Sequence, residues 1–157
     1  IKICGITRLE DAEVAVHAGA TAVGFVMWPN SPRFVDVASA ASIVRNLPSS
    51  LVKVGLFVNQ SVDLMCDVAV RVGLTTIQLH GDETPDCGAG LDRPVIKALS
   101  LDHADQKDAW PDDTLILLDA IHPVTRGGTG TRIDWQRAAT IARTRAPHAQ
   151  IQRELAC

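Results

Sequence analysis

Six short, almost uninterrupted apolar runs recur along this chain, and they restrict its fold more than any other feature. They occupy residues 1–4, 21–26, 51–58, 75–79, 94–99 and 114–119. A strand with one face in water alternates apolar and polar residues, whereas a continuous run indicates a strand covered on both faces. The runs therefore predict a parallel sheet with cover on each side.

Helical patterns fill the intervals between these runs. An apolar stripe at helical spacing runs over 37–47 and is closed by Pro48. Thr7-Arg8-Leu9-Glu10 has the form of a capping box for an earlier helix that we expect to end at Gly19. Further helices are expected at 62–72 with Ser61 as N-cap, at 135–143 with Asp134 as N-cap, and in weaker form at 83–91 and 102–110.

Strand–helix units in regular succession, with no linker between them, predict an α/β fold. Two architectures fit: an open doubly wound sheet or a (β/α)8 barrel of the TIM type. No Gly-x-Gly-x-x-Gly or Walker loop follows the first strand, which weakens the nucleotide-binding sheet. Polar residues follow the strands where a barrel gathers its chemistry, and this favours the barrel: Cys4, Arg33, Asn59, His80 and Asp119.

Composition excludes several classes of function. The net charge is −3 with both signs interspersed, so no basic face for nucleic acid is expected. No apolar run reaches the roughly 18 residues of a membrane span. The cysteines Cys4, Cys66, Cys87 and Cys157 have no zinc spacing. We expect them to be free thiols of a cytoplasmic protein.

Cys4 and Asp119 are the candidate catalytic pair. A thiol titrates near pH ~8.5, close enough to neutrality to serve as a base, and a carboxyl group in a barrel mouth can serve as a general acid. One base and one acid across a cavity suit a proton-shuttling isomerisation. Taken singly, Cys4 also fits a small buried hydrophobic residue, and Asp119 also fits a turn or cap.

Three loops carry candidate substrate contacts. The glycine loop 126–130 allows backbone amides to approach an anion, although a plain flexible loop looks similar. Arg33 lies on a proline-stiffened loop and can take a carboxylate in a bidentate pair, or be an ordinary exposed arginine. His80 can donate to a substrate oxygen or bond within the barrel mouth. The substrate-binding candidates are Arg33, His80, Gly127, Gly128, Thr129 and Gly130.

Taken together, these segments resemble the phosphoribosylanthranilate isomerase family of tryptophan biosynthesis. The similarity runs from the first residue to about Arg143, in the family's order and spacing. The segments that carry it are Lys2-Ile3-Cys4-Gly5-Ile6-Thr7, Ala22-Val23-Gly24-Phe25-Val26, Ser31-Pro32-Arg33-Phe34, Val54-Gly55-Leu56-Phe57-Val58-Asn59, Gln78-Leu79-His80-Gly81, Leu117-Leu118-Asp119, Gly127-Gly128-Thr129-Gly130 and Ile133-Asp134-Trp135.

The resemblance implies a TIM barrel that performs an Amadori rearrangement without cofactor or metal. Its substrate is a small phosphosugar, N-(5-phosphoribosyl)anthranilate, and its product is the 1-deoxyribulose 5-phosphate isomer. By analogy Asp119 protonates the furanose ring oxygen, the Cys4 thiolate removes the C2′ proton, and Arg33 holds the anthranilate end. Members of this family are monomers or homodimers.

Residues 144–157 depart from the family pattern. The family continues with two more strand–helix units whose glycine loops grip the phosphate, but this stretch has no apolar run and no glycine. We expect units one to six of a barrel over 1–143 and an atypical tail over 144–157. The alternative to an active isomerase is an inactive truncated homologue, or a fragment that needs a partner or the missing units. A sibling isomerase of histidine biosynthesis fits less well, because such enzymes place an aspartate where Cys4 stands.

Overall fold

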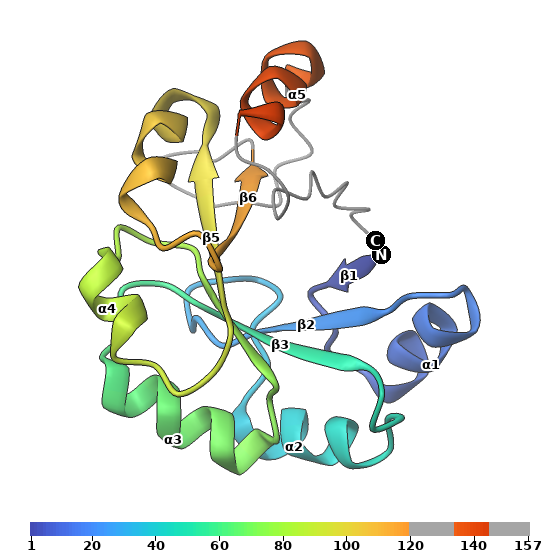
Figure 1. The fold of residues 1–157 in the computed structure, drawn as a ribbon. Helices are drawn as coiled ribbons and strands as arrows, with labels where there is room; N and C mark the ends of the chain where they lie inside the picture. Colours follow the sequence, from blue (N-terminus) through green and yellow to red (C-terminus); the bar gives the residue numbers. More distant parts are fainter. Residues whose placement is uncertain (120–133, 145–157) are drawn as a thin grey trace.

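In the computed structural model, which describes residues 1–119 and 134–144, one curled parallel sheet organises the chain (Figure 1). Its strands lie in chain order, each bonded to the next along the sequence. They are β1 (Lys2–Cys4), β2 (Ala22–Val26), β3 (Val52–Phe57), β4 (Thr76–Leu79), β5 (Val95–Ser100) and β6 (Leu115–Asp119). Every neighbouring pair is parallel, which confirms the prediction from the continuous apolar runs.

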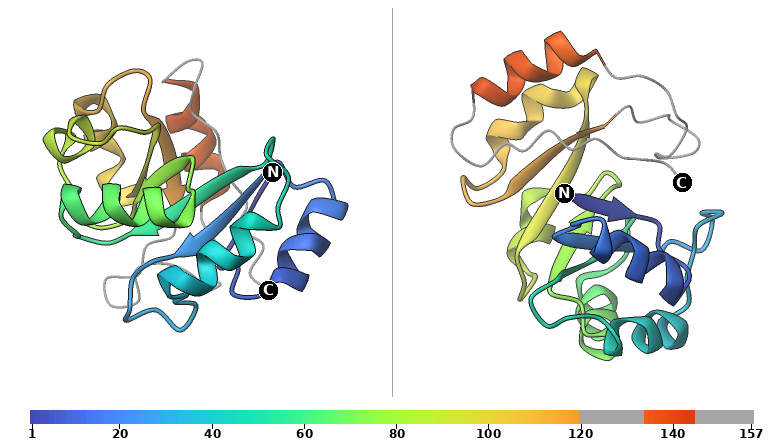
Figure 2. Two further views of the ribbon diagram at one scale, coloured as in Figure 1. Left: turned by 90° about the horizontal axis from the view of Figure 1, so that it is seen from below. Right: turned by 90° about the vertical axis from the view of Figure 1, so that its right-hand side faces the viewer.

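Helices follow the strands and cover the outside of the curl (Figures 1 and 2). They are α1 (Leu9–His17), α2 (Val37–Arg45), α3 (Val62–Val72), α4 (Pro85–Ala89), the 3₁₀ helix η1 (Leu101–Ala109) and α5 (Trp135–Arg143). The short α4 and the 3₁₀ form of η1 match the weak helical patterns seen in these two intervals. Because all strands are parallel, each connection carries the chain from the carboxyl end of one strand back to the amino end of the next.

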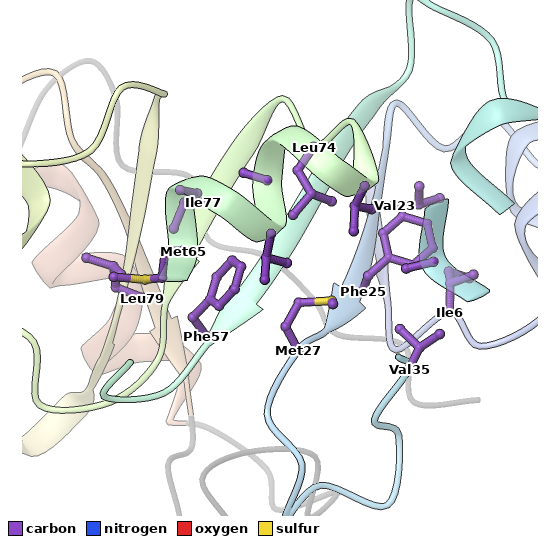
Figure 3. Packing of buried hydrophobic residues seen from close by; sticks show 14 of the residues in the cluster. Ile6, Val23, Phe25, Met27, Val35, Phe57, Met65, Leu74, Ile77 and Leu79 are labelled. Carbon is purple, nitrogen blue, oxygen red and sulfur yellow. The ribbon is translucent and has the colours of Figure 1, made fainter. Parts of the chain in front are cut away.

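The two faces of the sheet carry separate apolar clusters. We call the helix-covered side the outer face; here Phe25 and Phe57 pack with Met65 of α3 in the largest cluster (Figure 3). Burying a side chain of this size stabilises the fold by about 1.5–3 kcal/mol. We call the opposite side the inner face, where two smaller clusters lie. One comprises Val54, Ile96, Ala98 and Leu117, and the other Val26, Leu56 and Val58.

The N-caps expected for α3 and α5, Ser61 and Asp134, are confirmed. Ser61 Oγ accepts a hydrogen bond from the Leu64 amide at 3.4 Å, and α3 ends at Gly73 with a φ of 82°. Asp134 Oδ1 accepts from two amides of α5 at 3.0 Å each. These caps satisfy amides and carbonyls that have no partner inside the helix.

The capping box expected at the start of α1 is wrong. The N-cap of α1 is Arg8 rather than Thr7, and no side chain caps this helix. The Arg8 Nε instead lies 3.4 Å from Glu10 Oε2 in an exposed ion pair. Glu10, which the motif pairs with a backbone amide, therefore forms a surface ion pair instead, and such exposed pairs contribute little to stability.

Candidate active site

Cys4 and Asp119 end two strands on the inner face of the sheet. Cys4 packs against the inner cluster that contains Leu56. Leu56 and Val54 share one face of β3, because side chains alternate along a strand. Val54 in turn clusters with Leu117, which precedes Asp119 by two positions on β6. The two candidate catalytic groups therefore share one face, opposite the helices, at the carboxyl edge of the sheet.

Gly24 on β2 leaves the space that the Cys4 thiol occupies. Cys4 and Gly24 are register partners in neighbouring strands. A Cβ at Gly24 would lie 2.7 Å from Cys4 Sγ and 3.3 Å from Cys4 Cα. A side chain there would have to displace the thiol or the strand that carries it. The sulfur thus sits in a pocket made by the absence of a neighbouring side chain.

The structure brings Arg33 beside the Cys4 loop. A Cβ on Gly5 would lie 2.7 Å from Arg33 Cδ and 3.0 Å from its Nη1. Gly5 itself has a φ of +87°, a conformation that side chains rarely adopt. Arg33 is half-buried, and its amide donates to Ser31 Oγ at 3.2 Å. Its guanidinium therefore lies directly over the residue that follows the candidate base.

His80 is bonded on both sides within the barrel mouth, the second of the two roles that the sequence left open. Its side chain is 1% exposed, and Nε2 lies 3.1 Å from Asp119 Oδ2. Its Nδ1 lies 2.9 Å from Nε2 of Gln78, two positions earlier on β4. Gln78 was not among the sequence candidates. Its signal was present, because an amide inside an apolar strand is costly unless it is bonded.

A buried ion pair fixes the loop after β4, and sequence reasoning missed it. The side chains of Glu83 and Lys97 are each 3% exposed, and Lys97 Nζ donates to Glu83 Oε2 at 2.8 Å. Lys97 also donates to the Gly81 carbonyl at 2.7 Å and lies 5.5 Å from the Trp110 ring centroid. A lysine in the middle of the apolar run 94–99 was the available signal.

The Glu83 carboxylate also ties two strand ends together. It accepts from the Asn59 amide at 2.7 Å, beyond β3, and from the Gly81 amide at 2.9 Å, beyond β4. Asn59 itself has a φ of 54°, and its Oδ1 accepts from the Asp82 amide at 2.7 Å. These bonds set the position of the loop that begins at His80.

The charges of Glu83 and Lys97 also affect the pKa of the Cys87 thiol on α4. Burial and the negative charge of Glu83 raise the pKa of the Cys87 thiol, and the positive charge of Lys97 opposes them. Cys4, Cys66 and Cys87 are all free thiols, in line with the sequence prediction.

A cleft lies at the carboxyl end of β5. Ser100 is the register partner of Asp119 between β5 and β6. Its Oγ lies 2.9 Å from Nδ1 of His103 on η1. Both residues line a cleft of about 560 Å³, together with Glu83 and Lys97. The carboxyl end of β5 therefore borders a cleft with room for a small molecule.

Some predicted features lie outside the described residues. The glycine loop with Gly127, Gly128, Thr129 and Gly130 is one, and the expected tail over 144–157 begins with the last described residue. Within 1–119 and 134–144, no three His, Cys, Asp or Glu side chains are grouped as metal ligands. No helix in that part of the chain has the length and apolar character needed to cross a bilayer.

A parallel β/α sheet in chain order, with its polar groups at the carboxyl edge, places the protein among the TIM-barrel-type enzymes. A model of the N-(5′-phosphoribosyl)anthranilate isomerase family matches residues 1–150. The chain belongs to this family.

Individual relatives agree with this assignment. The N-(5′-phosphoribosyl)anthranilate isomerase of Geobacter sp. strain M21 is 45% identical over 140 residues, which cover 88% of this chain and 69% of the relative. The crystal structure of the Thermus thermophilus isomerase superposes with a TM-score of 0.81 at 34% identity, covering 91% of this chain and 71% of that one.

A further solved structure of this family contains a ligand. That phosphoribosylanthranilate isomerase is in complex with reduced 1-(o-carboxyphenylamino)-1-deoxyribulose 5-phosphate. It matches with a TM-score of 0.68 at 32% identity, over 94% of this chain and 83% of that chain.

Proposed function

We propose that this chain converts N-(5-phosphoribosyl)anthranilate to 1-(2-carboxyphenylamino)-1-deoxyribulose 5-phosphate, an Amadori rearrangement of tryptophan biosynthesis. Membership of the isomerase family supports the reaction. The relative that is complexed with a reduced form of the product supports the class of ligand, a small phosphosugar that carries an anthranilate group. The observation that carries the proposal is the placement of a thiol and a carboxyl group on one face, at one edge, of a parallel sheet.

The proposed chemistry needs one acid and one base. Protonated Asp119 gives its proton to the furanose ring oxygen while the bond from that oxygen to C1′ breaks, and the nitrogen lone pair forms the C1′=N bond of a Schiff base. The Cys4 thiolate then takes the proton from C2′, the electron pair of that C–H bond forms the C1′=C2′ bond of an enolamine, and the π electrons of the C1′=N bond return to the nitrogen. Tautomerisation of the enolamine gives the ketose. Separate groups suit the two transfers, because they occur at different atoms of the sugar.

Arg33 is the proposed anchor for the anthranilate carboxylate. A guanidinium binds a carboxylate through two parallel hydrogen bonds, which fixes orientation as well as position. Its position over Gly5 would hold the aromatic end of the substrate next to Cys4. We assign the phosphate end of the substrate to the glycine loop with Gly127, Gly128, Thr129 and Gly130. The proposed compartment is the cytoplasm, where free thiols such as these are kept reduced.

Turnover by variants of the purified chain tests this proposal. Cys4→Ala and Asp119→Asn should each lower kcat by about 10²–10⁴, the usual contribution of a general base or acid. Liquid chromatography that separates substrate from product gives the rates. Cys66→Ala on α3 and Asp112→Asn in the exposed loop before β6 are matched controls that should keep the parent rate.

Two outcomes would contradict the proposal. Wild-type rates in Cys4→Ala or Asp119→Asn would remove that residue from the mechanism. No detectable turnover by the parent chain, with a cooperative melt that shows it is folded, would mean that residues 1–157 alone do not have the activity.

A further inference from the structure

Gln78, His80 and Asp119 form a bonded row on the inner face of the sheet. Gln78 is completely buried and His80 is 2% exposed. Gln78 Nε2 lies 2.9 Å from His80 Nδ1, and His80 Nε2 lies 3.1 Å from Asp119 Oδ2. Because water is excluded from the imidazole, the two neighbours decide where its hydrogen resides.

The contacts select one tautomer of His80. An amide nitrogen can only donate, so Nδ1 of His80 must accept and carries no hydrogen. The hydrogen of the neutral ring is then on Nε2, which donates to Asp119 Oδ2. In this arrangement the oxygen of Gln78 is buried without a hydrogen-bond partner among the described residues.

The reverse orientation of the Gln78 amide is less favourable. It would place the oxygen against Nδ1 and leave the two N–H groups where the carbonyl now lies. An orphaned N–H is rarer in proteins than an under-satisfied carbonyl. It would also move the ring hydrogen to Nδ1, so that Nε2 and an ionised Asp119 would be two acceptors facing each other.

We propose that Gln78 is a positioning residue that holds His80 as its Nε2–H tautomer, so that His80 stabilises the carboxylate formed when Asp119 gives up its proton. This inference rests on the proposed function, in which Asp119 is the acid. The proton leaves Asp119 from Oδ1 for the ring oxygen of the sugar, and Oδ2 keeps the hydrogen bond from His80. His80 neither gains nor loses a proton in this step.

The benefit to catalysis lies in the change of that hydrogen bond during the reaction. A hydrogen bond to an ionised acceptor is shorter and roughly twice as strong as one between neutral groups. The His80–Asp119 bond therefore strengthens as charge develops on the carboxyl group, and an interaction of this kind lowers the barrier rather than merely tightening binding. In the other tautomer the lone pair of Nε2 would face Asp119 Oδ2 and would destabilise the negative charge that forms there.

Nitrogen NMR of the histidine side chains tests this directly in the wild-type chain. The His80 signals, assigned by their loss in His80→Asn, should show a protonated Nε2 and an acceptor-type Nδ1 at neutral pH. A protonated Nδ1 would overturn the inference while leaving the isomerase proposal intact. This measurement needs neither activity nor a Gln78 variant.

Replacement of Gln78 by glutamate gives the second test. A carboxylate next to Nδ1 can only accept, so Nδ1 of His80 should gain a hydrogen in Gln78→Glu. We expect kcat to fall by at least about tenfold, but by less than the 10²–10⁴ expected for loss of the acid itself, with KM little changed. Gln136→Glu on the exposed surface of α5 is the matched control and should change neither readout.

The two readouts separate the possible failures. An Nδ1 of His80 that stays unprotonated in folded Gln78→Glu would refute the positioning role. A shifted tautomer with unchanged kcat would refute its catalytic consequence. Unchanged kcat in Asp119→Asn would refute the acid role and so the proposed mechanism, whatever the tautomer of His80.

Discussion

Replacing Glu83 by glutamine should destabilise the fold strongly, although the two side chains have nearly the same size. The Glu83 carboxylate and the Lys97 ammonium are each 3% exposed and lie 2.8 Å apart. In Glu83→Gln the ammonium stays buried and loses its counter-charge. The amides of Asn59 and Gly81 also compete for the one remaining acceptor oxygen.

The expected cost follows from how buried charges behave. Removing one partner of a buried ion pair typically costs about 3–5 kcal/mol. Domains of ordinary size have a free energy of unfolding of about 5–15 kcal/mol, so the variant would lose a large part of its stability. Lys97→Met should cost less, because its stem stays against Trp110 and Glu83 keeps two amide donors.

Urea unfolding followed by circular dichroism measures these differences. The double variant Glu83→Gln/Lys97→Met should be more stable than the sum of the single losses predicts, since it contains no unpaired buried charge. Asp67→Asn is the matched control: its partner Arg71 is 3.2 Å away, but both side chains are more than half exposed. That variant should lose no more than about 1 kcal/mol. If Glu83→Gln cost no more than Asp67→Asn, the stabilising role of the buried pair would be refuted.

Three further predictions concern the site and its surroundings. In Gly24→Ala the new Cβ would meet Cys4 Sγ at 2.7 Å. We therefore expect a loss of about 1–3 kcal/mol of stability in the same urea assay and a lower turnover. Wild-type activity of this variant would contradict the tight packing. Arg33→Ala should mainly raise KM in steady-state kinetics if the guanidinium binds substrate and transition state alike, and an effect on kcat alone would argue against this. Alkylation of Cys87 by iodoacetamide should have its midpoint at higher pH in the folded chain than in urea, since burial and the charge of Glu83 raise the pKa of this thiol. The thiol then keeps its proton to a higher pH in the folded state than in the unfolded state, so stability should fall as the pH rises above the ordinary pKa of a thiol. Equal midpoints would refute the shift.

Most of the fold could be predicted from local patterns. The six apolar runs matched the six strands to within one or two residues at each end, because continuous burial on both faces leaves a strong signal. Ser61 and Asp134 were recognisable as caps, since a short polar side chain before an apolar stripe has few other uses. Thr7 failed as a cap because α1 begins one residue later than the motif predicts, with Arg8 as its N-cap.

The candidate site likewise contains residues that the sequence predicted and residues that it did not. Cys4, Arg33 and Asp119 were singled out because each is a reactive or charged residue at a strand end or in a loop. Gln78 and Lys97 were not, because a polar residue inside an apolar run looks like an isolated exception until its partner is known. Their roles depend on residues of other elements: Gln78 is linked through His80 to Asp119 on β6, and Lys97 on β5 pairs with Glu83 in the segment after β4.

The amino-acid order by itself thus determined the parallel α/β class and the sequence of strands and helices, and it supplied the candidate residues for proton exchange. Only the tertiary structure decided which side chains share a face, which ring nitrogen of His80 meets which neighbour, and that Glu83 and Lys97 neutralise each other. The reason is physical. Periodicity and capping depend on neighbours along the chain, whereas the partner of a buried polar group depends on which strands the sheet places next to each other.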